Sequence, residues 1–580
     1  MPELMNKYLG SRRRCPEKQI GMGCLIIFIL LLTGACNLKN DNKVSPEAIQ
    51  AINLKRGEVV LCGPADMQFG TAAFDISCSD SAKKEFNLAV ALLHSFEYDQ
   101  AEKVFAKIID AEPECAMAYW GVAMSNFHPI WAPSTPSELE KGTNAIKIAR
   151  SLNRKSERES DYIEAIAQCY ENRDKLDFHT RCLNYAKAME QVYKKYPDDK
   201  EAAIFYALSI VAAANPADKS FADQKKAGSI LNALYVVQPN HPGVIHYIIH
   251  TYDYPELAEI ALPVARRYAS IAPSSAHAQH MPSHIFTRLG LWDECIKSNL
   301  VSTSSAKCYA ENAPLKGHWD EELHGMDYLV YAYLQKAEDS LARLQWEYLK
   351  SINEVYPVNF KDAYAFAAIP ARYLLENKLW AEAAQLETHP DNFPWNKFPW
   401  EMATIHFTRV LGSVQSGNLS AAKNELKKLE VIYDTLKNEK DSYKANLVDI
   451  QMKAGGAWVL FKEGKKNEAL KKMDSAANME DATQKHPVTP GEVIPARELL
   501  ADMLLEMGDY GKALEAYKAD LRTHPKRLNG LYGAGLAAER SGNEEEAKSY
   551  YRQLSEQCIT NSRRPVLVSA RLYLKKHSQQ

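Results

Sequence analysis

Glycine is scarce in this chain: only 26 of its 580 residues are glycine, and they do not cluster. The chain therefore lacks a glycine-rich loop of the kind that cradles phosphates, and it also lacks the G-x-S-x-G pattern of many serine hydrolases. No two of its cysteines are close enough to form a C-x-x-C pair. These absences argue against the commonest phosphate-binding, serine-nucleophile and dithiol sites.

An excess of charge of either sign is also missing. Lys and Arg number 70 against 73 Asp and Glu, which gives a formal net charge of −3 at pH 7. Proteins that bind nucleic acids usually carry a basic excess that neutralises phosphates. We therefore expect no nucleic acid among the partners.

The length of the chain predicts more than one compact core. Hydrophobic residues make up 46% of the 580 positions, and single cores stop growing beyond about 250–300 residues. The chain is thus either several domains or a repeat array. From residue 81 to about 575 the apolar residues follow helical spacing, and strand-like alternation is absent. We predict an all-α fold with essentially no sheet.

The N-terminus has the pattern of an export signal. Basic residues precede the apolar run CLIIFILLL at 24–32, which is too short to span a membrane comfortably. The next residues, LLTGAC, resemble a bacterial lipobox, in which Cys36 is acylated and becomes the first mature residue. Thr33 replaces the aliphatic residue usual in that motif, so ordinary cleavage after Ala35 is the alternative.

The lipobox resemblance also implies a location. Asn37, rather than Asp, follows the cysteine, and in this family that favours the outer membrane over the inner one. We expect residues 1–35 to be a signal peptide. The mature chain is then an outer-membrane lipoprotein of the bacterial cell envelope, facing the periplasm or the exterior, with the membrane bound through its N-terminal lipid anchor.

Disulfides are expected in an oxidising compartment of this kind. Cys62 and Cys78 lie 16 residues apart in a segment with turn residues, so we predict a bond between them, with two free thiols as the alternative. Cys115 and Cys295 occupy small-residue positions in helical patterns, where a cysteine usually acts as a small hydrophobe.

A period of 34 residues runs through the helical part. MGDYGKALEAYKADL at 507–521 aligns with SGNEEEAKSYYRQL from Ser541, which places Ala513 over Ala547 and Tyr517 over Tyr551. A fixed interval of this length indicates stacked supersecondary units. Each unit needs a small residue where its two helices cross, an aromatic residue behind the crossing and a proline after the second helix. These roles fall to Ala101, Phe105 and Pro113 in one unit and to Ala513, Tyr517 and Pro525 in another.

This pattern resembles the tetratricopeptide repeat, a helix-turn-helix unit of the same length. The resemblance implies a solenoid of helical hairpins over most of residues 81–555, as in bacterial tetratricopeptide lipoproteins of uncharacterised role. We expect a lipid-anchored tether and loop-rich N-terminal cap at 36–80, N-terminal repeats at 81–302, irregular central repeats at 303–477 and C-terminal repeats at 478–580. This family resemblance predicts a fold but does not predict an activity.

Eight of the sixteen histidines lie between residues 241 and 324. HYIIH at 246–250 and HMPSH at 280–284 each place two histidines four residues apart, and the two pairs are 34 residues apart. Residues four apart project together from one flank of a helix. In tetratricopeptide arrays the first helix of each hairpin lines the concave groove, so the resemblance implies that His246, His250, His280 and His284 converge there.

Further residues occupy equivalent positions in these repeats. His277 lies one turn before His280, and aligning the next repeat places His324, Asp327 and Tyr331 in the positions of His277, His280 and His284. We expect His277, His324 and Tyr331 to line the groove and Asp327 to lie beside the four histidines. Pro282 disfavours helical geometry at Met281, so the helix is expected to break there or to begin at Pro282.

Three interpretations of this cluster remain open. Neutral imidazoles converging with a carboxylate suit Zn, Ni or Cu(II), so His246, His250, His280, His284 and Asp327 form a candidate site for a divalent transition metal. A groove without metal could instead hold a carboxylate or phosphate of a partner. The third interpretation is purely structural, with each ring satisfied by its own hydrogen bonds.

The leading function is binding rather than catalysis. Neither histidine pair is followed by glutamate, so the H-E-x-x-H form of metalloproteases is absent. We expect an exported scaffold that holds a protein, peptide or small ligand in its groove. The alternatives are a metal-dependent hydrolase built on the same five residues and a glycan-capturing outer-membrane lipoprotein.

We predict that Cys36 carries lipid. Replacing it with Ser removes the thiol that lipid attachment requires, and the protein should then become soluble or stay unprocessed when membranes are fractionated. Unchanged fractionation with the membrane would favour ordinary cleavage after Ala35.

Overall fold

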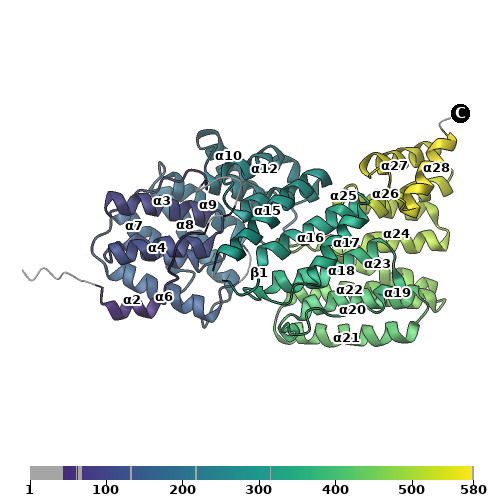
Figure 1. The fold of residues 1–580 in the computed structure, drawn as a ribbon, viewed down its shortest axis with the longest axis horizontal. Helices are drawn as coiled ribbons and strands as arrows, with labels where there is room; N and C mark the ends of the chain where they lie inside the picture. The colour runs from purple at the N-terminus through teal and green to yellow at the C-terminus, as the bar shows by residue number, and fades with distance from the viewer. Residues whose placement is uncertain are drawn as a thin grey trace, which may run out of the picture. The chain divides into compact units, whose positions relative to one another are not determined.

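The computed structural model describes residues 44–60, 62, 68–130, 133–215, 218–313 and 315–577. Residues 44–580 form one compact unit. The segment at 1–35 that is predicted to be a signal peptide lies outside the described residues, as does Cys36. Apart from two short strands, the regular elements of the described chain are all helices, which confirms the predicted fold class (Figure 1).

The first half of the unit contains the helices α2 to α15. They are α2 (Pro46–Ile52), α3 (Asp80–His94), α4 (Tyr98–Ala111), α5 (Ala116–Ser125), α6 (Pro136–Ser151), α7 (Glu157–Ala167), α8 (Phe178–Lys195), α9 (Lys200–Ala213), α10 (Ala222–Val237), α11 (Pro242–Thr251), α12 (Ala258–Ile271), α13 (Ala276–His280), α14 (Pro282–Arg288) and α15 (Trp292–Asn312). The helix α2 lies in the segment that was expected to be rich in loops.

The second half continues the same arrangement. It consists of α16 (Asp320–Gln335), α17 (Asp339–Leu349), α18 (Phe360–Glu376), α19 (Trp380–Ala383), the 3-10 turn η1 (Trp395–Lys397), α20 (Pro399–Gln415), α21 (Leu419–Asn438), α22 (Ser442–Lys462), α23 (Lys466–Ala482), α24 (Ala496–Met507), α25 (Tyr510–Thr523), α26 (Leu528–Arg540), α27 (Glu544–Gln557) and α28 (Pro565–His577). The boundaries expected at 302/303 and 477/478 fall inside α15 and α23.

The only strands among the described residues are two short ones. β1 (His318–Trp319) pairs in parallel with β2 (Val355–Tyr356). This pair joins the segments before α16 and α18 and leaves the helical architecture unchanged. No helix in the described ranges is long and apolar enough to cross a membrane.

Consecutive helices pack as hairpins, and hairpins stack on their neighbours. Within hairpins, α3 contacts α4, α20 contacts α21 and α26 contacts α27. Between hairpins, the first helices contact each other, as in α16 with α18 and then α18 with α20 and α20 with α22. The stack also brings α3 against α11, although they are far apart in the sequence.

Small residues at the crossings hold these hairpins together, among them the predicted Ala101 and Ala513. Each is completely buried: Ala101, Ala227, Ala261, Cys295, Ala342, Ala422, Ala469, Ala513 and Ala547. The aromatic residue behind the crossing packs on a glycine of the next helix. A Cβ added to Gly121 would lie 2.3 Å from the Phe105 ring, and one added to Gly533 would lie 2.2 Å from the Tyr517 ring. The close approach therefore requires glycine at both places.

Two hydrophobic cores meet at α16. Tyr328, Tyr331 and Ala332 belong to the N-terminal core, which extends from Ile52 onward. Leu323 and Met326 belong to the C-terminal core, which extends to Ala570. Because residues three or four apart share one face of a helix, α16 turns a different face to each core.

The disulfide prediction is wrong in its pairing. Cys62 is bonded to Cys308, 246 residues away, and Cys78 is bonded to Cys115, 37 residues away. The stacking explains the second bond, because Cys78 precedes the cap of α3 and Cys115 caps α5, two first helices in contact. Cys115 is therefore not merely a small hydrophobe, whereas Cys295 is a buried free thiol as expected.

One buried carboxyl group opposes folding at neutral pH. Glu401, in the first turn of α20, is 1% exposed, and among the described residues neither of its carboxylate oxygens finds a hydrogen-bond partner in another residue. Burial raises the pKa of this group to about 7. The pKa of Glu401 is therefore higher in the folded chain than in the unfolded chain. Below the unfolded pKa the group is protonated in both states and folding has its full stability. That stability is lost as the pH rises through about 7, because the unfolded chain releases this proton more readily.

We expect Glu401→Gln to stabilise the protein at alkaline pH. At pH 8 its free energy of unfolding in urea should exceed that of the wild type by up to about 3 kcal/mol, and the difference should shrink towards zero near pH 4. The exposed Glu430→Gln is the matched control, for which we expect no pH-dependent gain. An equal gain at both pH values would assign the effect to packing rather than charge.

Candidate metal centre

Four helices from three successive hairpins bring six histidines together. α11 carries His246 and His250, α13 carries His277 and His280, and α14 carries His284. The sixth, His324, lies on α16. Met281 between α13 and α14 keeps right-handed helical angles, with φ −51° and ψ −36°. His277 and His280 therefore lie on a short helix before Pro282, and not on a loop.

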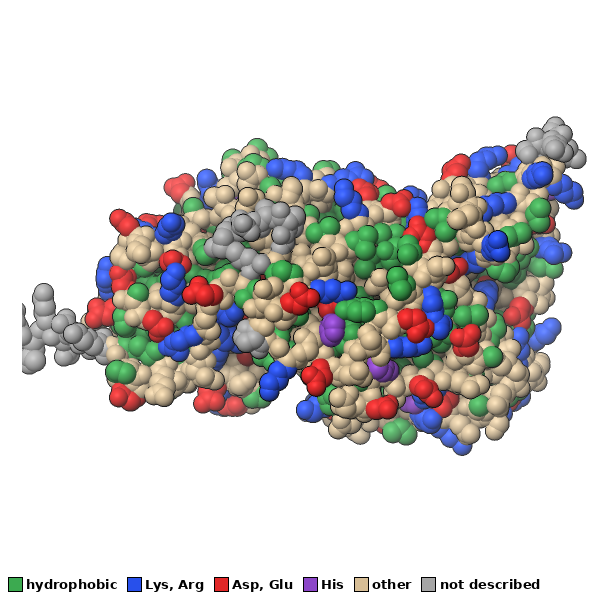
Figure 2. Space-filling model, in the orientation of Figure 1, with side chains coloured by type: hydrophobic (Ala, Val, Ile, Leu, Met, Phe, Trp, Pro, Cys, Tyr) green, Lys and Arg blue, Asp and Glu red, His purple; other side chains and the backbone are tan. Residues whose placement is uncertain are grey.

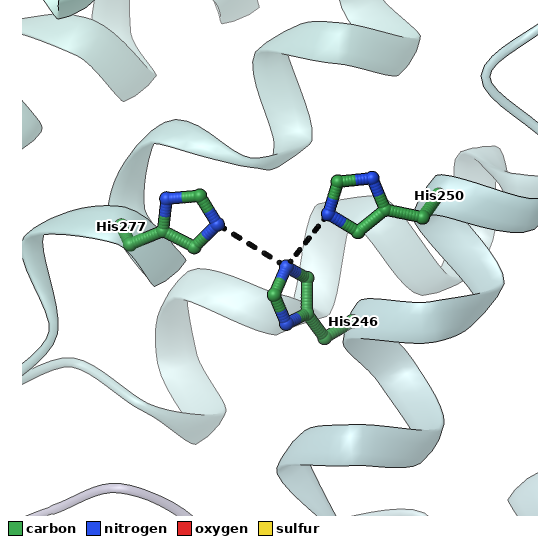
Figure 3. Close-up of side chains that lie close together, drawn as sticks. All are labelled: His246, His250 and His277. Atoms are coloured by element: carbon green, nitrogen blue, oxygen red, sulfur yellow. Dashed lines mark hydrogen bonds between the residues drawn. The ribbon is translucent and has the colours of Figure 1, made fainter. Parts of the chain in front are cut away.

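The first three rings form a cluster that we call the His246 triad: His246, His250 and His277. The Nε2 atom of His246 lies 3.1 Å from Nε2 of His250 and 3.2 Å from Nε2 of His277. Figure 3 shows the other two rings pointing at this one nitrogen from two sides. The Phe96 ring packs against all three imidazoles, with centroid distances of 4.3, 5.5 and 5.8 Å.

The other three rings form the His280 triad: His280, His284 and His324. The Nε2 atoms of His280 and His284 are 3.1 Å apart. The His324 ring lies 4.2 Å from the His280 ring and 6.3 Å from the His284 ring, measured between centroids. In each triad the possible ligand atoms all lie within 4.8 Å of one another. Each triad could thus hold one ion.

The two triads are neighbours. The ring centroids of His250 and His284 are 6.1 Å apart, and those of His277 and His280 are 6.4 Å apart. All six side chains are buried, with between 0% and 7% of each residue exposed. The six imidazoles therefore form one buried region with two centres.

The Nδ1 nitrogens of these rings form hydrogen bonds with oxygen atoms on neighbouring segments. His246 Nδ1 donates to the backbone carbonyl of His94 at 2.6 Å. His280 Nδ1 donates to Asn299 Oδ1 at 2.6 Å, and the Asn299 amide nitrogen donates to the Cys295 carbonyl, which fixes the orientation of the amide. Each of these two rings therefore carries its proton on Nδ1 and leaves Nε2 as a lone pair.

His284 is held in the same way by a carboxylate. Its Nδ1 donates to Asp253 Oδ2 at 3.1 Å. The same carboxylate accepts from Arg288 at 2.9 Å and from Lys485 at 2.9 Å. Although burial acts in the opposite direction, Lys485 and Arg288 hold the pKa of Asp253 well below its usual value. An ionised Asp253 can only accept, so the proton of His284 is on Nδ1.

His277 makes a similar but longer contact. Its Nδ1 lies 3.5 Å from Glu321 Oε2, and Lys361 forms an ion pair with Glu321. Despite burial, Lys361 and then His277 hold the pKa of Glu321 well below its usual value. Metal-binding histidines in proteins generally donate their second nitrogen to such carboxylates or carbonyls.

Burial keeps most of these rings neutral. It is the largest cause that lowers the pKa of His246, His250, His280 and His324 well below the usual value, and neighbouring histidines lower it further. Burial likewise lowers the pKa of His284 to about 4, although Asp253 opposes this. Neutral imidazole is the form that binds a metal.

The structure groups the predicted site residues differently from the prediction. The four histidines at 246, 250, 280 and 284 lie in one region, but they divide two and two between the triads. His277 and His324, expected only as lining residues, complete them. Asp327 joins neither triad: its Oδ1 accepts from Arg372 at 2.9 Å. Tyr331 packs on Trp292 instead, at a ring distance of 5.2 Å.

The helical register explains these corrections. His324 and Asp327 are three residues apart on α16, but His324 packs on the His280 ring whereas Asp327 pairs with Arg372 of α18. Asp327 faces α18, where Arg372 also donates to the carbonyls of Gly491 and Glu492 in the loop that precedes α24. The expectation of a carboxylate ligand at Asp327 is therefore corrected to a histidine at His324.

A third polar cluster lies beside the His246 triad and was not predicted. His94 Nε2 and His241 Nε2 each donate to one oxygen of Glu201, both at 2.9 Å. His94 belongs to α3, and Glu201 to α9, so the sequence offers no common period that would group them. Both rings here carry the proton on Nε2, which distinguishes them from the triads.

Comparison with known proteins supports the repeat character of the C-terminal part. Residues 499–561 match the tetratricopeptide repeat family, and this segment contains the clearest 34-residue period. No curated protein matches the chain.

Solved structures resemble the chain only weakly. The APC/C hetero-tetramer Cut9–Hcn1 is 12% identical, covers 85% of this chain and 89% of its own, and gives a TM-score of 0.31. The human IFIT1 dimer with m7Gppp-AAAA is 12% identical over 80% of this chain and 94% of its own, with a TM-score of 0.36. The P58(IPK) TPR domain is 16% identical over 66% of this chain and 100% of its own, with a TM-score of 0.20.

The hydrogen bonds predict a specific tautomer for five of these histidine rings. In the metal-free chain at pH 7, with its histidine rings labelled with ¹⁵N, long-range ¹H–¹⁵N spectra should place the proton on Nδ1 of His246, His280 and His284. His94 and His241 are the internal comparison and should carry it on Nε2. A proton on Nε2 of His280 would contradict the hydrogen-bond assignment.

Proposed function

We propose that this chain is a helical-repeat scaffold that binds two transition-metal ions, one at each histidine triad. The observation that carries the proposal is the 3.1 Å contact between Nε2 of His280 and Nε2 of His284. Both rings commit their only proton to an oxygen through Nδ1. Two lone pairs therefore face each other, and such a contact is repulsive unless something positive lies between them.

A metal ion fits this place better than a proton. A shared proton would turn one ring into a cation in a region that water barely reaches, and burial disfavours the charged form. An ion held by three imidazoles satisfies all the facing nitrogens at once. The donors behind the rings, a carbonyl, an amide oxygen and carboxylates, are those that orient metal-binding histidines in proteins.

The spacing within the His246 triad supports the same conclusion. Zinc binds imidazole nitrogen at about 2.0–2.1 Å, so two nitrogens at corners of a tetrahedron lie about 3.3 Å apart. The Nε2 of His246 lies 3.1 and 3.2 Å from its two neighbours. The rings are thus already placed close to the geometry that an ion requires.

The donor set narrows the choice of metal. Neither triad includes a carboxylate or a carbonyl oxygen, which Mg, Ca and Mn prefer. Imidazole nitrogen suits Zn, Ni and Cu. Three protein ligands also leave a fourth position open, as in catalytic rather than purely structural zinc sites.

The scaffold itself is proposed to act in the cell envelope. Helical-hairpin stacks offer extended surfaces for proteins or peptides, and on the face in Figure 2 acidic and basic side chains intermingle. We propose that Cys36 anchors the chain to the outer membrane and that the repeats bind a protein or peptide partner. The disulfides Cys62–Cys308 and Cys78–Cys115 are consistent with an oxidising compartment.

Metal analysis should find two ions in each chain. The purified full chain is stripped with chelator, loaded with Zn²⁺ and freed of excess, and its zinc is then measured by mass spectrometry. We expect about two equivalents in the wild type. His246→Gln with His277→Gln should retain one equivalent, and His280→Gln with His284→Gln should likewise retain one.

The exposed His179→Gln is the matched control and should retain both ions. Helix content by circular dichroism checks that each variant is folded. Less than a tenth of an equivalent of zinc in the folded wild type, and of nickel and copper in parallel loadings, would overturn the proposal and leave a shared proton or purely structural rings.

A further inference from the structure

The most informative feature beyond metal binding is the pairing of the two triads. They are built on adjacent hairpins with the same ligand type, and rings from different triads approach to 6.1 and 6.4 Å between centroids. His277 and His280, on one short helix, belong to different triads. Two ions bound here would therefore be close neighbours within one buried region.

We propose that the two triads form a single two-copper centre that binds dioxygen between its ions. This inference rests on the proposed metal sites and specifies their metal and their ligand. In the step that we propose, two Cu(I) ions each lose one electron and become Cu(II). One O₂ takes up both electrons and becomes O₂²⁻, which fills the open fourth position of each ion.

The charges around the triads favour monovalent ions. All six ligands are neutral imidazoles, and the two nearest carboxylates are already paired with cations. Asp253 is bonded to Arg288 and Lys485, and Glu321 is bonded to Lys361. Two divalent ions bring four positive charges into this buried region and two Cu(I) ions bring only two, so monovalent ions fill both triads with less mutual repulsion.

Coulomb's law gives the size of this difference. At equal separation, the repulsion between two doubly charged ions is four times that between two singly charged ions. Copper is the metal of the imidazole-binding group that has a stable monovalent state. A pair of Cu(I) ions thus meets both the donor type and the charge of the site.

The surroundings of the triads restrict the ligand to a small uncharged molecule. None of the six histidines is more than 7% exposed. Aromatic rings cover both triads: Phe96 packs on the His246 triad, and Tyr328 lies 4.6 and 5.2 Å from the rings of His280 and His284. Dioxygen is small and apolar enough to enter such a region, and the dianion that forms would offset the positive charge of the oxidised ions.

Dioxygen uptake by the copper-loaded chain tests the proposal. The full chain is loaded under anaerobic conditions with two equivalents of Cu(I), supplied as its acetonitrile complex, and is then mixed with O₂. We expect one O₂ consumed for two copper ions and a new near-ultraviolet absorption band. Less than a tenth of the copper should appear as isolated Cu(II) in the electron paramagnetic resonance spectrum, because the bridged ions couple magnetically.

Single-ligand variants provide the comparison. His324→Gln weakens only the His280 triad and His250→Gln only the His246 triad, so each should hold one copper ion firmly. One ion cannot supply two electrons, and neither variant should develop the absorption band. Their copper should appear as isolated Cu(II) after oxidation. The exposed His179→Gln should behave like the wild type.

The outcomes separate this inference from the proposed metal sites. If the wild type binds two Zn²⁺ but no Cu(I), or if its oxidised copper is all isolated Cu(II), the metal sites stand and the two-copper centre is wrong. If the same band forms in His324→Gln, the pairing of the triads is wrong. If neither metal binds, both proposals fail.

Discussion

The arrangement of the histidines depends on hydrogen bonds from Nδ1 atoms to oxygens on neighbouring segments. His246 is held by the carbonyl that ends α3, His280 by Asn299 of α15, and His284 by Asp253 after α11. Each bond fixes both the direction of the ring and the position of its proton. Because the rings are buried, their Nε2 lone pairs cannot turn towards water, and they point at one another. The candidate metal centre is thus a consequence of how the hairpins stack.

The stack that makes these bonds is itself held by buried ion pairs between distant segments. Arg527, before α26, bonds Glu498 of α24 and Glu376 of α18. Arg372 joins Asp327 of α16 to the loop before α24, and Lys485 of that loop bonds Asp253, which holds His284. Removing one partner of a buried pair leaves an uncompensated charge at a cost of about 3–5 kcal/mol. The loop and the second core are therefore coupled to the His280 triad.

The sequence allowed the helical hairpins and the shared region of four histidines to be predicted, because both follow from a 34-residue period. Ala101, Ala513 and the other crossing residues occupy the expected buried positions. The period could not show how three hairpins curve around one another, so it did not reveal that α3 reaches α11 or that Cys62 reaches Cys308. The period also predicted that Asp327 lies with the histidines. Repeat spacing alone does not show that α16 packs against two cores. The grouping of His94, Glu201 and His241 depends on such long-range contacts and has no local signal.

The most direct test of the metal centre is a crystal structure of the metal-loaded full chain with data collected at the absorption edge of the metal. The account predicts two anomalous peaks, each about 2.0–2.1 Å from three Nε2 or Nδ1 atoms. One peak should lie among His246, His250 and His277 and the other among His280, His284 and His324. A fully loaded crystal with no peak at either triad, or with its metal held by Asp327, would contradict the account.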